Sequence, residues 1–84
     1  MNVQDALGIT TEGIRRIDET IGETEQTRDF LVQAEGIMIE TLGTQNEETA
    51  KFAHAIQEVA AVQEGLNHTK LHLESLQGVL ADIL

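Results

Sequence analysis

Leu42-Gly43-Thr44-Gln45-Asn46-Glu47 lies at the midpoint of the 84-residue chain and decides how the chain folds. Glycine readily adopts the left-handed conformation that commonly ends a helix. Thr44 has the hydroxyl group of a helix N-cap, and Glu47, three residues later, completes the pattern of a capping box. The segment therefore predicts one helix that ends at Gly43 and a second that is capped by Thr44, which together form an antiparallel helical hairpin.

The sequence on both sides of this turn has the periodicity of a helix. Apolar residues recur at steps of three and four, which places them on one helix face. We therefore predict an all-α fold in a single domain, residues 1–84, with helix one over about residues 11–42, a turn at 43–44 and helix two over about 45–83. The predicted interface residues are Ile14, Ile17, Ile21, Leu31, Met38, Phe52, Ile56, Val59, Leu66, Leu73, Leu76 and Leu80, and the stripe of the second helix also takes in Val62, Thr69 and Ile83.

The short chain needs a source of stability beyond its own core. Small domains are commonly stabilised by disulfides, metals or oligomerisation, and this chain has no cysteine. A two-helix hairpin also cannot bury two wide apolar stripes by itself. We therefore expect the hairpin to associate into a four-helix bundle, with itself or with a homologous hairpin as partner.

A continuous helix is the alternative. Gly8, Gly22, Gly36 and Gly43 share one heptad phase, so Gly43 could also be a glycine tolerated within a helix. The chain would then form a single long coiled-coil helix.

The charge of the chain argues against several kinds of partner. Asp and Glu outnumber Lys and Arg by 15 to 5, for a net charge of −10. Nucleic acids and anionic lipids are bound mainly through basic residues, so neither is an expected partner. No apolar run approaches the roughly 20 residues that cross a bilayer, and the N-terminus lacks the features of a signal peptide. We expect a cytoplasmic protein, or one secreted without a cleaved signal peptide.

The side chains that could carry chemistry do not form a recognisable site. His68 and His72 are four residues apart and Glu64 extends the row, but the residues between the histidines lack the glutamate of H-E-x-x-H. Ser75 is the only serine. We therefore predict no catalytic site, no metal site and no cofactor.

The central turn resembles that of the WXG-motif family, the small helical-hairpin proteins of type VII secretion. In that family a W-x-G turn is often followed by a hydroxyl residue and an acid, and here Gly43, Thr44 and Glu47 match while Thr41 stands in place of tryptophan. The resemblance implies a homo- or heterodimer of hairpins, secreted or chaperone-like, that needs no cofactor.

The same segment is also similar to the centre of a Q-type SNARE motif. Gln45 would be its polar layer, with Met38 and Leu42 before it and Thr49 and Phe52 after it. This second resemblance implies an assembly subunit that contributes one continuous helix to a bundle with other chains.

Overall fold

A computed structural model describes residues 2–84 of the predicted domain, and its first helix, α1, spans Val3–Leu42. Asn2 is the N-cap: its side chain accepts a hydrogen bond from the Asp5 backbone N–H at 2.9 Å, and the Asp5 carboxylate accepts from the Asn2 N–H. The helix thus begins eight residues before the predicted start. Thr10 lies inside the helix, and its hydroxyl donates to the Ala6 carbonyl at 2.8 Å, a bond that a threonine within a helix can make.

The chain then reverses through residues 43–46 into the second helix, α2, which spans Glu47–Ile83. Gly43 has φ 85° and ψ 166°, so the positive φ predicted for it is present. This region of backbone conformation is essentially confined to glycine. The Gly43 N–H donates to the Ile39 carbonyl at 2.9 Å, and the Thr49 hydroxyl donates to the Gly43 carbonyl at 3.0 Å. The backbone N–H of Gly43 is therefore bonded to α1, and its carbonyl is bonded to α2.

The cap of α2 is Asn46, and the prediction of Thr44 was wrong. Asn46 Oδ1 accepts a hydrogen bond from the Glu48 backbone N–H at 2.8 Å, and Glu47 is the first residue of the helix. The predicted Thr44–Glu47 capping box is therefore not formed. Asparagine is at least as good an N-cap as threonine, and the later start leaves four residues instead of two to reverse the chain.

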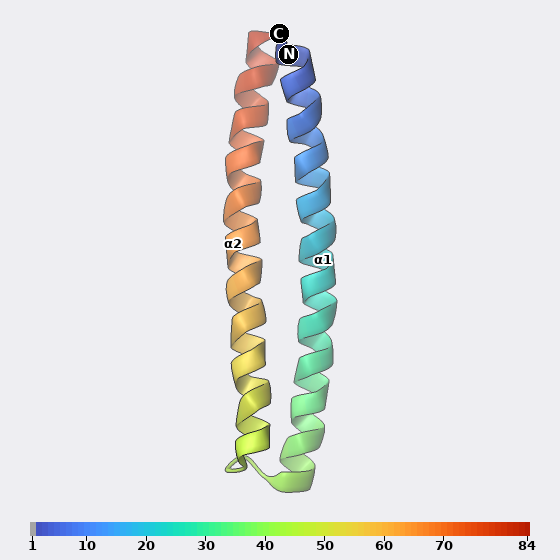
Figure 1. Cartoon of the computed structure of the whole chain (residues 1–84), viewed down its shortest axis with the longest axis vertical. Helices are drawn as coiled ribbons and strands as arrows, with labels where there is room; N and C mark the ends of the chain where they lie inside the picture. The colour runs from blue at the N-terminus through green and yellow to red at the C-terminus, as the bar shows by residue number, and fades with distance from the viewer. Residues whose placement is uncertain (1) are drawn as a thin grey trace.

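The two helices lie side by side along their whole length, and both ends of the chain are at the same end of the hairpin (Figure 1). The Cα atoms extend over 59 × 16 × 14 Å. Residues 2–84 contain no strand. The chain is an all-helical hairpin, and the single continuous helix is not formed because the backbone turns at Gly43.

Two cross-helix contacts define the register of the hairpin. Lys70 Nζ lies 2.6 Å from Asp18 Oδ1, and Gln77 Nε2 donates to Thr11 Oγ1 at 3.0 Å. The two residue numbers add up to 88 in both contacts. A residue of α1 and a residue of α2 therefore lie at the same level along the hairpin when their numbers add up to about 88.

The interior of this hairpin is unusual for a protein. Among residues 2–84 no apolar side chain is fully buried, and the three buried residues, Thr10, Thr49 and Gln63, are all polar. Many large apolar side chains are instead exposed, and Phe30 is exposed to 67%. Neither helix, over the described residues, is long and apolar enough to cross a membrane. Two helices alone thus do not enclose a hydrophobic core.

Candidate interaction surface

The residues between the helices repeat every seven positions. In α2, and in α1 up to Thr24, the residues between the helices alternate at steps of three and four, the spacing of an antiparallel coiled coil. Beyond Thr24 the α1 position of this spacing at Arg28 is exposed, whereas that at Glu35 is half-buried. The α1 members of this seam are Val3, Leu7, Thr10, Ile14, Ile17, Ile21, Thr24, Leu31, Glu35 and Met38. The α2 members are Thr49, Phe52, Ile56, Val59, Gln63, Leu66, Lys70, Leu73, Gln77 and Leu80.

Most of the predicted interface residues lie in this seam. Eleven of the twelve are half-buried, and the exception is Leu76, which is 46% exposed. The seam also contains Gln63, Lys70 and Gln77, which the predicted apolar stripe of helix two does not include. That stripe steps by three from Ile56 to Val59 and by three again to Val62, so beyond Val59 every second member of the stripe lies off the seam. A strict alternation of three and four from Thr49 onward would have found all three.

The rows of residues beside the seam form two opposite faces. Asp18 and Thr11 reach Lys70 and Gln77 on one side. On the other side, a Cβ placed on Gly13 would lie 3.5 Å from Leu73 Cδ1. We call the side of Gly13 face 1 and the side of Asp18 face 2. The face 1 rows are Ala6, Gly13, Thr20, Thr27, Ala34 and Thr41 of α1 with Glu48, Ala55, Val62, Thr69, Leu76 and Ile83 of α2. The face 2 rows are Gln4, Thr11, Asp18, Glu25, Val32 and Ile39 of α1 with Ala53, Ala60, Asn67, Glu74 and Ala81 of α2.

Face 1 exposes more large apolar side chains than face 2. Its rows have one charged residue, Glu48, and those of face 2 have three, Asp18, Glu25 and Glu74. We call the row of residues next to a face, on the side away from the seam, the outer flank of that face. The outer flanks of the two faces carry similar numbers of charges: Arg16, Glu23, Lys51 and Glu58 beside face 1, and Arg15, Asp29 and Glu64 beside face 2. Seven of the twelve large exposed apolar side chains lie on face 1 or on its outer flank. Those in the rows are Val62, Leu76 and Ile83, and those on the flank are Ile9, Phe30, Ile37 and Val79. Patches of this kind on a soluble domain usually mark an interaction site.

A groove of about 280 Å³ opens on face 1 near the turn. Leu31 of α1 and Phe52 and Ala55 of α2 supply its apolar lining, and Glu48 and Lys51 form its edge. The Lys51 ammonium group pairs with the Glu48 carboxylate at 3.1 Å, so the two charges at the edge neutralise each other. The groove contains neither serine nor histidine and offers an apolar recess to another side chain.

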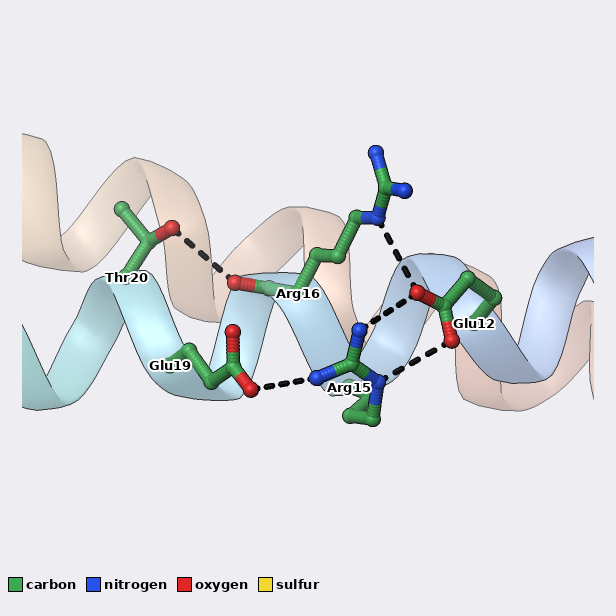
Figure 2. Close-up of polar contacts among 5 residues, drawn as sticks. All are labelled: Glu12, Arg15, Arg16, Glu19 and Thr20. Carbon is green, nitrogen blue, oxygen red and sulfur yellow. Dashed lines mark hydrogen bonds and ion pairs between the residues drawn. The ribbon is translucent and has the colours of Figure 1, made fainter.

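A cluster of charged side chains lies on α1, and its contacts are all within that helix (Figure 2). Arg15 bridges Glu12, through contacts of 2.5 and 3.0 Å, and Glu19. Arg16 Nε donates to Glu12 at 3.1 Å. These hydrogen bonds, first that of Arg15 and then that of Arg16, lower the pKa of Glu12 to about 2, and the same pairing raises the pKa of Arg15. All partners lie within two turns of one helix, so the cluster supports α1 without joining the helices.

The residues considered for chemistry are all on the surface. His68, His72, Glu64 and Ser75 are exposed along α2. Among residues 2–84, no group of three or more histidine, aspartate or glutamate side chains is arranged to hold a metal ion. The predictions of no catalytic site and no cofactor stay predictions.

Comparisons with other proteins assign no relative to this hairpin. No family model, no curated protein and no solved structure matches the chain. Its function has to be argued from the surface itself.

Proposed function

We propose that this chain is a non-enzymatic interaction protein, a helical hairpin that acts as a dimer by packing into a four-helix bundle. The observation that carries the proposal is that the described hairpin buries no apolar residue completely and leaves its large apolar side chains exposed. Burial of apolar surface is the dominant favourable term in folding. Two helices that leave this surface exposed are therefore stabilised when a second pair of helices covers it. Four-helix bundles bury such stripes by packing helices about 20° apart.

A non-enzymatic role is supported by how the polar groups are used. Arg15, Arg16 and several of the acids pair within their own helix, as in the Glu12–Arg15–Glu19 cluster. Lys70 and Gln77 bridge the two helices. These groups stabilise and align helices. Glu12 and Arg16 also line an open recess on α1, but there the two side chains bond to each other.

Within this class we favour a small protein of the WXG type in type VII secretion. The support is the hairpin itself, with Gly43 at a turn between two arms of 40 and 37 residues. The SNARE-like alternative requires helix through Gly43, and in this structure Gln45 lies in the turn. The secretion role is tested by expressing the chain in a bacterium that has a type VII system: intact chain in the medium, lost when the system's ATPase is deleted, is the expected result.

Dimerisation is tested by sedimentation of the purified chain together with thermal unfolding at several concentrations. We expect a species of twice the monomer mass and a melting temperature that rises with protein concentration, since association stabilises the folded state by mass action. A monomer that melts cooperatively at a temperature independent of concentration would contradict the proposal.

A further inference from the structure

The rows of face 1 combine large side chains on one helix with small ones on the other. The α1 row consists of alanine, glycine and threonine only, whereas the α2 row includes Val62, Leu76 and Ile83. The register of the hairpin sets each large residue at about the level of a small one. The pairs at equal level are Ile83 with Ala6, Leu76 with Gly13, Thr69 with Thr20, Val62 with Thr27 and Ala55 with Ala34.

Resting on the dimer proposed above, we propose that two copies of this chain pack face 1 against face 1 with their turns at the same end. The two-fold axis then runs parallel to the long axis of the hairpins. In this arrangement α1 of each copy covers α2 of the other at the same level. Every large residue of the α2 row is thus opposite a small residue of the partner's α1 row, as close packing of an interior requires.

The inverted arrangement, with the turns at opposite ends, packs the α1 rows poorly. Each helix would then cover its own counterpart, so small residues of α1 would meet small residues and leave space unfilled. The α2 rows would still set Leu76 against Ala55, but at their ends the Glu48–Lys51 ion pair would lie against Ile83. Unfilled volume and a desolvated ion pair both weaken an interface.

Ile37 and the groove of face 1 supply a second, separate observation. Ile37 is 64% exposed on the α1 flank of face 1, and the register places it at the level of Lys51 at the edge of the groove. An axis along the hairpin brings Ile37 of each copy over the α2 side of the other, where the groove opens.

The size of the face is also adequate for a stable dimer. The Cα envelope of 59 by 16 Å corresponds to about 900 Å², close to the roughly 800 Å² that each partner contributes to a standard interface. A second copy can therefore cover face 1 without further chains.

The orientation is tested with one spin label per chain. The chain has no cysteine, so Gln45→Cys gives a single attachment site in the turn. Turns at the same end predict a distance between the two labels of about 20–40 Å by pulsed electron resonance, since neighbouring helices in a bundle are about 8–10 Å apart. A distance of about 60 Å or more, the length of the hairpin, would overturn the proposed arrangement and leave the dimer intact.

The face is tested with matched charge substitutions. Leu76→Glu and Val62→Glu place a carboxylate on face 1, and we expect each to weaken the dimer about 100-fold or more because the charge is buried unpaired. Leu71→Glu is the control: Leu71 is 62% exposed on the flank of face 2, and the substitution should change dimer affinity less than about threefold. A dimer that resists both face 1 variants but is lost in Leu71→Glu would overturn the face assignment. If the unaltered chain does not dimerise, the proposed function itself fails.

Discussion

The half of the hairpin near the turn and the half near the free ends are held together differently. Near the turn the seam of α2 is apolar at Phe52, Ile56 and Val59, whereas α1 contributes Thr24 and Glu35 beside Leu31 and Met38. Toward the free ends the polar seam residues are on α2, at Lys70 and Gln77, whereas α1 is apolar at Ile14, Ile17 and Ile21. Both halves gain free energy from apolar burial. The open half also gains alignment, because Lys70 and Gln77 make polar contacts across the helices and a polar pair has one good geometry.

The largest effect is expected at the largest apolar side chain of the seam. Phe52→Ala should lower the free energy of unfolding by about 2 kcal/mol, since a partly buried phenylalanine loses less than one in a full core. Leu73→Ala, at the equivalent heptad position of the open half, should cost less because leucine is smaller than phenylalanine. Denaturant unfolding at one fixed protein concentration measures both. Equal costs would show that the loss does not follow the size of the side chain removed.

The turn itself supplies the next largest effect. Gly43→Ala should destabilise the hairpin by about 1–3 kcal/mol, because φ 85° with ψ 166° strains any residue that has a Cβ. Gly36→Ala is the matched control within α1, where a Cβ meets no atom within 4 Å, and it should stabilise the helix by about 0.5–1 kcal/mol. Opposite signs in thermal melts are the expected outcome. Stabilisation by both substitutions would mean that the chain does not turn at Gly43.

The helix cap gives a smaller change. Asn46→Ala should cost about 1 kcal/mol through loss of the bond to the Glu48 N–H, whereas Thr44→Ala should change the free energy of unfolding by less than about 0.5 kcal/mol. The comparison of the two variants in denaturant decides which residue caps α2. A larger loss from Thr44→Ala would restore the cap that the sequence pattern predicts.

In the open half, removal of the Asp18–Lys70 pair should cost less still. The Asp18 and Lys70 side chains are 50% and 32% exposed, so Asp18→Asn should destabilise the hairpin only slightly, and the loss should shrink in high salt. The hydrogen bond with Asp18 raises the pKa of Lys70, so the substitution should also lower that pKa, measurable by NMR. Asp29→Asn, on the exposed surface of α1, is the control. An unchanged Lys70 pKa would mean that the pair does not form.

The exposed ion cluster should give the smallest effect. The pKa of Glu12 is depressed to about 2, so its stabilising contribution is present above its ordinary value of 4.5 and is lost as the pH falls through 2. Arg15→Gln removes the first cause of the shift and should return the pKa of Glu12 toward 4.5 in an NMR titration. The melting temperature should change little. A pKa of Glu12 that stays low in Arg15→Gln would assign the shift to Arg16 instead.

Local signals in the sequence were enough to predict the class of fold. Apolar residues at helical spacing predict two helices, and a glycine at the midpoint predicts the break, because both depend on interactions within a few residues. The same reasoning placed eleven of the twelve interface residues at partly buried positions. The prediction was wrong where two nearby residues can both serve as the N-cap, as Thr44 and Asn46 can. Which of them caps the helix depends on how many residues the chain needs to reverse its direction.

The sequence by itself thus determined the helices, the position of the turn and the acidic character of the chain. Only the tertiary structure decided which side of each helix faces the other. Hydrophobicity alone favours Val62 and Leu76 in the seam. Two packed helices, however, touch along one row of residues on each helix, and in a coiled coil that row keeps strict heptad spacing. Gln63, Lys70 and Gln77 therefore lie between the helices. The displaced apolar row is left on face 1, where a second hairpin can cover it.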